Sequence, residues 1–536
     1  MNESLRHLYW LTWASLGLAA CFSVVLHIAV RHRQRWLRYT AAEAGFWIRL
    51  GVPEKLANAS RRFSEGRYNN FALGAIIITY ILLAVACGTL YLRFKHQLPA
   101  KRPPEAVAFY NAGASLNKSG DYAGAVSNFT KAIEIFPDYH EAYSFRARAK
   151  YNLDDYNGAI ADANQAIRLN PAYEPAYNVR GFSRFMLNDY AGAIVEFDKS
   201  LKLDSTYAPA FNQRGLAEAD LTNYPAAIGD FNRAIKLKPD YAVAYYDRGQ
   251  VEQGLTNYPA AVSDFSRAIE SHADFPTAFN MRGLTKWCLR DYEGTITDCT
   301  EAIKLNPKFW EAYNNRGLAE SDLGHYTAAI IDFDKAIALN PHCEIAYYNR
   351  GNARYHLRDW TAAVSDFNRA IELKPDDFRP YGYLGYVQTD LFQFEAALKT
   401  FQKALELDPS AAEYRFRIWA LRSRMNDGPG ATDELQNYLR SLKEKTMTWP
   451  AAVGWYLVGA FSERNFLGCA AKSDQKTRDW WQCRANYYAG MKHLIAGDKV
   501  GAMDFFQQSL NTGQTNRTEY ISAEVELNAL KKVIPP

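Results

Sequence analysis

The sequence predicts an all-α protein, in which a solenoid of helical hairpins follows two transmembrane helices. Three observations predict this architecture. Two segments near the N-terminus lack charged residues over lengths that cross a lipid bilayer, proline recurs in steps of 34 residues between Pro137 and Pro409, and small residues recur at fixed places between these prolines. A chain of 536 residues is too long for a single hydrophobic core, so a repeat array is one arrangement that its length allows.

The two uncharged segments cover residues 8–30 and 71–92, which contain no Lys, Arg, Asp or Glu. At about 1.5 Å per residue, a helix of either length spans a hydrocarbon core about 30 Å thick. Aromatic side chains such as Trp10 and Tyr91 lie near the outer ends of the segments, where amphipathic rings settle among lipid headgroups. We therefore expect two transmembrane helices.

The connector between the two spans, residues 31–70, is strongly basic. It holds nine Lys and Arg residues, against one before the first span and four directly after the second. Because loops rich in Lys and Arg stay in the cytoplasm, we expect both termini, and the repeats with them, to lie on the periplasmic side of a bacterial inner membrane. The nine basic residues are Arg31, Arg33, Arg35, Arg38, Arg49, Lys55, Arg61, Arg62 and Arg67.

A second interpretation of the first span starts from Leu-Ala-Ala-Cys at residues 18–21, which resembles the lipobox of a bacterial lipoprotein signal. The residues after Cys21 continue the apolar run, whereas a mature lipoprotein usually begins with a polar tether, so we favour the span. His27 inside this span is an ionisable residue of a kind that is often functional in membranes. The second span holds no partner histidine, so we interpret His27 as a polar residue near the interface.

The repeat array covers residues 106–411 and contains nine units of 34 residues, numbered so that residue 106 is position 1 and Pro137 is position 32. Position 8 is glycine in eight units, position 20 is alanine in eight, and position 24 is phenylalanine in seven. Small residues at positions 8 and 20 let two antiparallel helices approach closely, and the aromatic residue at position 4 of every unit fills the seam between them. The proline at position 32 of seven units ends the second helix.

This pattern strongly resembles the tetratricopeptide repeat family. Residues 311–324, Glu-Ala-Tyr-Asn-Asn-Arg-Gly-Leu-Ala-Glu-Ser-Asp-Leu-Gly, match the family almost residue for residue. The resemblance implies a right-handed superhelix of stacked hairpins with a concave groove, because one hairpin cannot bury its own apolar face. The family's receptors for chaperone tails use Lys at position 5 and Asn at position 9 of their first unit, where this chain has Tyr110 and Ala114, so that binding mode is not expected.

Beyond Pro409 the phase of the repeat weakens. Residues 483–514 recover it as a degenerate unit, residues 519–533 are expected to form a capping helix, and residues 412–482 are expected to be helical without a defined packing. The degenerate unit places Gly490, Gly497, Ala502 and Phe506 at positions 8, 15, 20 and 24. The predicted organisation is an anchor at 1–104, nine repeat units at 105–411 and a helical extension at 412–536.

No motif for a catalytic, cofactor or metal site is present in the sequence. The patterns GxxxxGK[ST], GxGxxG, HExxH, GxSxG and CxxC are all absent. Residues 115–118 and 473–476 match SxxK, in which a lysine can activate a serine nucleophile, but so short a pattern arises readily by chance. We expect no enzyme activity, no cofactor and no metal site.

Position 7 is arginine in seven units, and position 23 is acidic in the same seven. Where position 7 is Ala112 or Leu384, position 23 is Asn128 or Thr400. Because the two positions face each other across a hairpin that turns near position 15, we predict structural salt bridges rather than an arginine ladder for a ligand. The predicted pairs are Arg146 with Asp162, Arg180 with Glu196, Arg214 with Asp230, Arg248 with Asp264, Arg282 with Asp298, Arg316 with Asp332, and Arg350 with Asp366.

Recognition is then left to the face formed by positions 5, 6, 9 and 12 of the first helices. A side-chain amide both donates and accepts a hydrogen bond, so repeated asparagines at positions 5 and 6 suit the main chain of a bound peptide. Aromatic residues at position 12 are candidate anchors, although some of these rings would instead seal the junction between repeats. The candidates are Asn111, Asn178, Asn212, Asn280, Asn314, Asn315, Asn349, Tyr151, Phe185, Trp287 and Tyr355.

Together these observations predict a non-enzymatic scaffold or assembly factor of the bacterial envelope that binds a peptide or protein client. Two alternatives remain open: a recruiting component of an envelope glycan or protein modification or export machine, and a cytoplasmic adaptor if the orientation is inverted. Residues 105–536 hold 48 Lys and Arg against 54 Asp and Glu, so no nucleic-acid partner is expected, and no small-molecule substrate is indicated. In an oxidising compartment, Cys469 and Cys483 are candidates for a disulfide across the polar stretch between them.

The charge of the connector generates a topology prediction. Protease added to spheroplasts should digest residues 106–536 and leave residues 31–70 intact, because the nine positive charges hold the connector inside. Immunoblotting with antibodies against each segment measures the outcome. Repeats that survive until the cells are lysed would show the inverted orientation.

Overall fold

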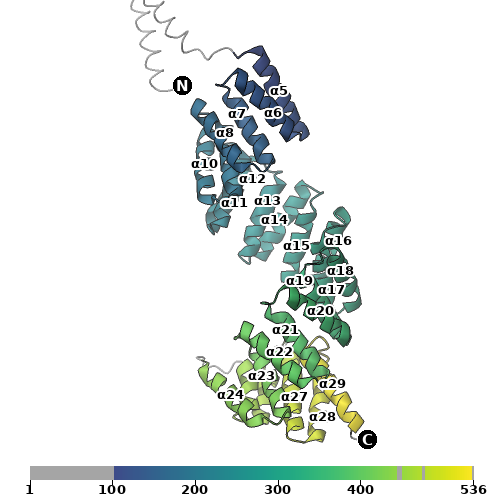
Figure 1. Ribbon diagram of the computed structural model, residues 1–536. Coiled ribbons are helices and arrows are strands. Elements are labelled where there is room, and N and C mark those ends of the chain that lie inside the picture. Colours follow the sequence, from purple (N-terminus) through teal and green to yellow (C-terminus); the bar gives the residue numbers. More distant parts are fainter. Residues whose placement is uncertain (1–101, 443–448, 474–476, 534–536) are drawn as a thin grey trace, which may run out of the picture. The chain divides into compact units, whose positions relative to one another are not determined.

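The computed structural model of the protein describes residues 102–442, 449–473 and 477–533, and the regular structure of these residues is entirely α-helical (Figure 1). The helices make up the second of two compact units, which begins at Glu105. None of the helices in this described part is long and apolar enough to cross a membrane. The predicted spans at 8–30 and 71–92 lie outside the described residues and remain predictions.

Nine consecutive hairpins follow the 34-residue step of the sequence, and we call them repeats 1 to 9. From repeat 2 onward, every first helix has 13 residues and every second helix has 14. The repeats are α5 (Pro104–Ser119) with α6 (Tyr122–Ile135), α7 (His140–Asn152) with α8 (Tyr156–Leu169), α9 (Glu174–Met186) with α10 (Tyr190–Leu203), α11 (Ala208–Asp220) with α12 (Tyr224–Leu237), α13 (Ala242–Gly254) with α14 (Tyr258–Ser271), α15 (Pro276–Cys288) with α16 (Tyr292–Leu305), α17 (Trp310–Asp322) with α18 (Tyr326–Leu339), α19 (Glu344–His356) with α20 (Trp360–Leu373), and α21 (Phe378–Asp390) with α22 (Phe394–Leu407).

The turn inside each hairpin contains one residue in the left-handed backbone conformation. Position 15 has a φ between 58° and 88° in all nine repeats, and in seven of them it is not glycine, although an L-residue in this conformation costs roughly 1–2 kcal/mol. In five repeats the next residue is an aspartate, for example Asp121, that caps the second helix through a backbone N–H three residues further on. The left-handed residues are Gly120, Asp154, Asn188, Thr222, Thr256, Arg290, Gly324, Arg358 and Phe392.

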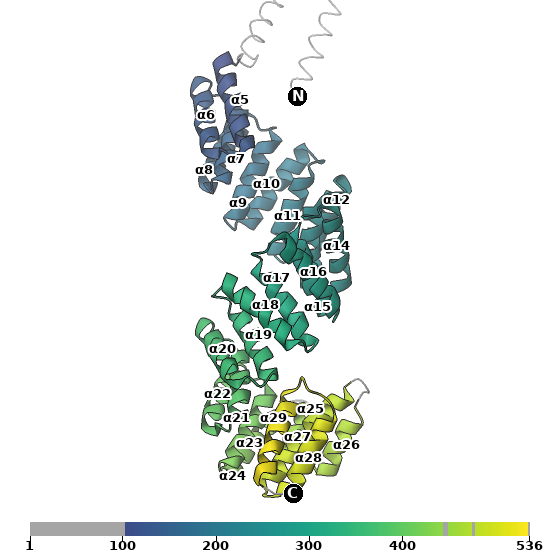
Figure 2. The same ribbon diagram turned by 90° about the vertical axis from the view of Figure 1, so that its right-hand side faces the viewer.

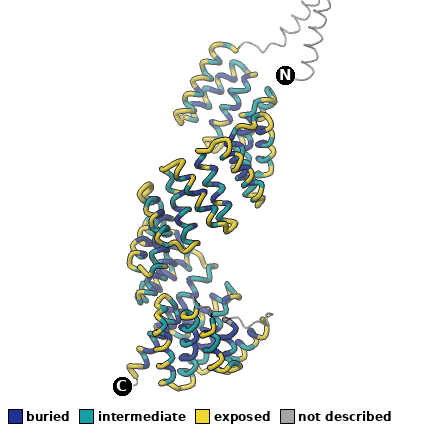
Figure 3. The backbone as a smooth tube through the Cα atoms, turned by 180° about the vertical axis from the view of Figure 1, so that it is seen from behind, coloured by how far each residue is buried: buried dark blue, intermediate teal, exposed yellow. Residues whose placement is uncertain are grey.

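Positions 8 and 24 make the closest approach between the two helices of a repeat. In seven repeats a Cβ atom added to the position 8 glycine would lie 2.8–2.9 Å from the position 24 phenylalanine ring, and all seven rings are fully buried. Repeat 6 has the smaller Cys299 at position 24, and the same distance from Gly283 to its Sγ is 3.1 Å. Buried residues therefore form the inside of each hairpin, whereas exposed residues gather at the turns (Figure 3).

Residues 412–441 form a tenth hairpin, repeat 10, from α23 (Ala412–Arg424) and α24 (Gly428–Ser441). It keeps the 34-residue step, with Asn426 in the left-handed conformation at position 15. The packing of these residues could not be predicted from the sequence. The unit could not be recognised in the sequence because Trp419 stands at position 8, where the other repeats have a small residue.

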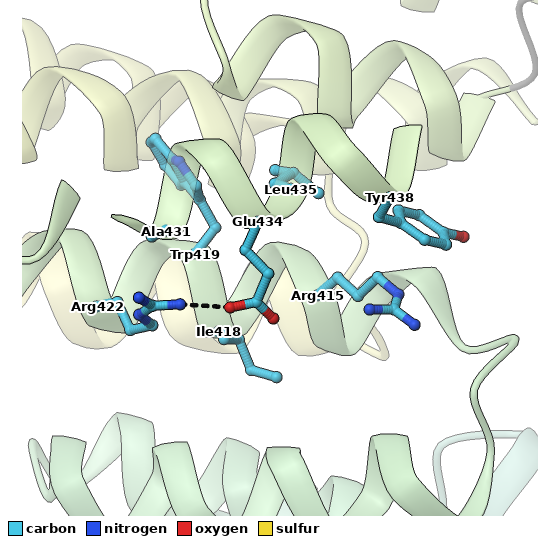
Figure 4. Close-up of a pocket in the computed structure, with 8 residues that line it drawn as sticks. All are labelled: Arg415, Ile418, Trp419, Arg422, Ala431, Glu434, Leu435 and Tyr438. Carbon is cyan, nitrogen blue, oxygen red and sulfur yellow. Dashed lines mark hydrogen bonds and ion pairs between the residues drawn. The ribbon is translucent and has the colours of Figure 1, made fainter. Parts of the chain in front are cut away.

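The interior of repeat 10 differs from that of the other repeats because of this tryptophan. Trp419 on α23 packs with Ala431 and Leu435 of α24, which occupy positions 20 and 24 (Figure 4). The gap between the two helices has a volume of about 10 Å³, which is room for roughly one water molecule. It is a packing gap between two helices and is too small for a ligand.

Five helices follow repeat 10 (Figure 2). Residues 483–514 pack as the expected degenerate unit, because Gly497 has a φ of 82° at the turn and Gly490 lies under the Phe506 ring. The last helix packs on α27 and α28 and also contacts α21 of repeat 9. The five helices are α25 (Trp449–Leu457), α26 (Glu463–Ala471), α27 (Arg478–Ile495), α28 (Lys499–Asn511) and α29 (Thr518–Val533).

The contact between positions 8 and 24 generates a stability prediction. Gly215→Ala should lower the free energy of unfolding by about 1–2 kcal/mol, because the new Cβ would lie 2.9 Å from the buried Phe231 ring. Gly229→Ala, in the second helix of the same repeat, is the matched control. Nothing lies within 4 Å of its new Cβ, so it should stabilise the protein by about 0.5–1 kcal/mol. Urea unfolding measures both, and equal effects would contradict the packing described here.

Candidate functional site

The seven position 7 arginines all contact the acidic residue at position 23 of their own repeat. In six repeats the contact is bidentate, with Nε and Nη2 donating to the two aspartate oxygens at 2.5–3.0 Å. In repeat 3, Arg180 contacts Glu196 through Nη2 alone, at 2.5 Å. The acidic side chains are at most 10% exposed. Paired geometry of this kind is typical of strong, charge-assisted hydrogen bonds.

The same arginines also reach the preceding repeat. Each Nη1 donates to the side chain at position 25 of the repeat before, as Arg214 does to Asp198 at 2.6 Å. Each guanidinium also lies 5.4–5.7 Å from the aromatic ring at position 4 of its own helix. The position 25 acceptors are Thr130, Asn164, Asp198, Asn232, Ser266, Thr300 and Asp334.

These contacts satisfy hydrogen-bond donors of the seven position 7 arginines inside the chain. Hydrogen bonds to Asp230 hold the pKa of Arg214 above its usual value, so the guanidinium stays charged at any ordinary pH. The arginine ladder therefore ties position 7 to position 23 in one repeat and to position 25 in the repeat before.

The asparagines at positions 5 and 6 are placed differently from the sequence expectation of an open ladder. Asn178, Asn212, Asn280, Asn314 and Asn349 are at most 7% exposed, Asn315 is half-buried and Asn111 is exposed. Four of the five buried amides take part in three hydrogen bonds that join position 5 of one repeat and position 6 of the next. The bonds are Asn212 to Asp247 (2.7 Å), Asn315 to Asn280 (3.0 Å) and Asn349 to Asn314 (3.0 Å).

The four position 12 aromatic residues divide into two kinds. Tyr355 is fully buried and donates to Asp390 at 2.9 Å, and Trp287 donates to Asp322 at 2.6 Å. Both acceptors stand at position 13 of the next repeat, so these two rings join neighbouring repeats. The other two are half-buried: Phe185 packs against Tyr190, and Tyr151 packs against Tyr156 and Phe182.

The two cysteines considered for a disulfide are unpaired in the structure. Cys483 is fully buried on α27, with its Sγ 3.3 Å from Ser509 Oγ, whereas Cys469 is only half-buried on α26. Burial raises the pKa of the Cys483 thiol to about 11, so this thiol is not a reactive thiolate at neutral pH.

An open groove lies on the first helices of repeats 2, 3 and 4. Its volume is about 530 Å³, which is within the range of ligand sites. Two residues of the predicted set, Tyr151 and Asn178, line it. The lining residues are Ser144, Phe145, Arg148, Tyr151 and Asn152 of α7, Tyr173 before α9, Glu174, Pro175, Asn178, Val179 and Phe182 of α9, Tyr207 before α11, Pro209 and Gln213 of α11, and Tyr241 before α13.

Arg148, Phe182 and the three tyrosines that precede first helices, Tyr173, Tyr207 and Tyr241, were not singled out from the sequence. Position 9, which holds Arg148 and Phe182, was named as part of the recognition face without its residues. A signal for the tyrosines was present, because position 34 is tyrosine in each of the first four units. Three of them, Tyr173, Tyr207 and Tyr241, precede the first helices of repeats 3 to 5 and line the groove.

The groove combines one free cation with a bonded carboxylate and aromatic walls. Arg148 is exposed and forms no ion pair with another residue of the described part of the chain. Glu174 accepts hydrogen bonds from Ser200 at 2.8 Å and from Asn178, and burial raises its pKa against the opposing effect of these bonds. Burial also raises the pKa of Tyr207, although the positive charge of Arg148 opposes the shift. The site suits a segment with a carboxylate beside an apolar side chain.

Comparisons with known proteins agree with this architecture. Two family models described as tetratricopeptide repeat match the chain, one at residues 110–174, 212–278, 280–341 and 314–378, and the other at 379–410. No curated protein matches the chain in sequence.

Three solved structures are similar in part. Yeast Tom70 is 18% identical, with a TM-score of 0.34, and the match covers 80% of this chain and 96% of that chain. YrrB, a TPR protein with an unusual peptide-binding site, is 21% identical, with coverage of 34% and 95% and a TM-score of 0.31. The first TPR of Spaghetti (RPAP3), solved with an HSP90 peptide, is 28% identical, with coverage of 22% and 94% and a TM-score of 0.22.

The stacked hairpins and their repeating contacts define this chain as an α-helical solenoid of the kind that serves as a protein-interaction scaffold. More specifically, it is a tetratricopeptide repeat protein, of a family that binds peptides or proteins and is typically not catalytic.

The position 25 contacts generate a prediction about the arginine ladder. Asp230→Ala should lower the free energy of unfolding by about 1–3 kcal/mol, because Arg214 keeps its ion pair with Asp198. The double variant Arg214→Ala with Asp230→Ala should cost less than the sum of the single variants. Additive losses would contradict a direct contact.

The matched comparison is Asp298→Ala in repeat 6. It should cost more, about 3–5 kcal/mol, because Arg282 keeps only the Ser266 hydroxyl at 3.1 Å and Lys286 also loses its partner. Urea unfolding of both variants measures the difference. An equal loss in the two repeats would show that the position 25 contact adds nothing.

Proposed function

We propose that this protein is a membrane-anchored scaffold or assembly factor whose groove on repeats 2 to 4 binds a segment of a peptide or protein client. The observation that carries the proposal is Arg148. Seven other arginines of the first helices are tied to acidic partners, whereas Arg148 stands unpaired, within the described residues, at a groove lined with aromatic rings. A free cation beside apolar walls is typical of a surface that anchors a carboxylate and a neighbouring apolar side chain.

The burial of the asparagines removes most of them from the proposed binding site. Amides that already bond between repeats are poor candidates for the main chain of a client, so the ladder at Asn212, Asn280 and Asn314 is better explained as a joint. Asn178 remains a candidate, because its Oδ1 accepts no hydrogen bond and the residue lines the groove. Tyr151 remains the candidate anchor from the aromatic set.

Membrane anchoring is the second part of the proposal. It rests on the uncharged segments at 8–30 and 71–92 and on the basic connector between them. With the connector in the cytoplasm, the groove would face the periplasm, and clients would be proteins of the cell envelope.

The groove is tested with a tagged full-length chain used to capture clients from solubilised membranes, followed by mass spectrometry. Arg148→Ala should weaken a captured client at least tenfold, since a hydrogen bond to a charged group is worth about 1.5–3 kcal/mol. Gln250→Ala is the matched control, because Gln250 is also exposed at position 9 but lies outside the groove. A client that binds Arg148→Ala as tightly as the wild type would exclude this groove as its site.

A further inference from the structure

The last helix, α29, returns to the repeats instead of continuing the array. It contacts α21 of repeat 9 and packs on α27 and α28 (Figures 1 and 2). Its residues bond partners more than 100 positions earlier in the chain. Glu524 pairs with Arg358 at 2.6 Å, Ser522 donates to Asp390 at 2.7 Å, and Glu526 pairs with Arg424.

The repeat residues that hold α29 belong to the same face that is open in repeats 2 to 4. Asp390 and Arg424 stand at position 13 of repeats 9 and 10, and Arg417 stands at position 6 of repeat 10. In the open groove these two positions are Asn152 and Phe145 of repeat 2. The helix α29 thus covers, in repeats 8 to 10, the surface that corresponds to the groove.

The contact between α29 and this face contains polar pairs that are complementary in charge, beside apolar packing. The repeats contribute Arg358, Arg417 and Arg424, and α29 contributes Glu519, Ser522, Glu524 and Glu526. In the apolar cluster shared with repeats 8 to 10, α29 supplies Ile521 alone. Its other buried apolar residues, Ala523, Leu527 and Leu530, belong to the cluster formed with α23 to α28, which includes Phe416 and Leu435 of repeat 10.

The burial of the Asp390 carboxylate opposes this contact. Its carboxylate is fully enclosed, accepts hydrogen bonds from Ser522 and Tyr355, and faces both Arg417 and Glu526. Burial raises its pKa to about 7, against the opposing effects of Ser522, Arg417 and Tyr355. A carboxylate that burial destabilises is better solvated when the helix is away.

We propose that the face of repeats 8 to 10 is a second protein-binding surface, which α29 covers as an intramolecular occupant, and that an acidic amphipathic helix of a partner binds there in place of α29. The partner helix presents carboxylates to Arg358 and Arg424 and a small apolar group to the site of Ile521. The surface does not depend on the groove of repeats 2 to 4, so either site can be disproved without the other.

The test uses a labelled peptide of residues 515–536 as the helix and the full-length chain as the receptor. Glu524→Arg places two positive charges together at Arg358 and should open the contact, so that the peptide binds this variant at least tenfold more tightly than it binds the wild type. Hydrogen exchange of residues 518–533 should accelerate in the same variant. Fluorescence anisotropy and exchange mass spectrometry give the two readouts.

Two variants serve as controls. The charge swap Arg358→Glu with Glu524→Arg should restore closure and return both readouts to the wild-type values. Lys531→Glu changes a charge on an exposed part of α29 and should change neither readout. Ser522→Ala, which removes the bond to Asp390 without adding charge, should increase peptide binding to a smaller extent than Glu524→Arg.

Two results would overturn the proposal. The first is unchanged exchange of α29 and no gain in peptide binding in either Glu524→Arg or Ser522→Ala. The second is a loss of helix in repeats 8 to 10 in both variants, seen as accelerated exchange of α19 to α23, because α29 would then be a fixed part of the core.

Discussion

The guanidinium at position 7 is the interaction on which the array depends. It connects the two helices of its own repeat through position 23 and reaches back to position 25 of the repeat before. A buried ion pair adds little net stability over a well-packed apolar contact, but losing one partner leaves a charge without compensation. The contact therefore sets the register between successive hairpins. The groove at Arg148, which spans repeats 2 to 4, depends on that register.

A second set of contacts joins neighbouring repeats through their first helices. Bonds from position 5 to position 6 and from position 12 to position 13 cross from one repeat to the next, as in Asn212 to Asp247 and Tyr355 to Asp390. Asp247 and Asp390 are buried, and burial raises the pKa of Asp247 to about 6. The side chains at these positions of the first helices are therefore of two kinds. Some join neighbouring repeats, and others line the groove.

The contacts within a hairpin could be predicted from the sequence, whereas the contacts between distant parts could not. Positions 7 and 23 change together in the first and ninth units, and the 34-residue step places them opposite each other, so the salt bridges follow from the sequence. The burial of Asn280 depends on how the next repeat docks, which position within a unit does not define. Repeat 10 could not be recognised from the sequence because Trp419 replaces the small residue at position 8. Nothing local in α29 indicates that Glu524 meets Arg358, 166 residues away.

The joint formed by position 7 uses the same arginine atom, Nη1, and the same acceptor position, 25, in seven successive repeats. A hairpin that is deleted or duplicated as a whole would meet its new neighbour through an equivalent joint, whereas a shift of one or two residues inside a hairpin would move the guanidinium out of reach. The array can therefore change length in evolution only by complete units. Repeats 5 to 7, which lie between the groove and the face covered by α29, then act as a spacer whose length can be altered without changing either surface.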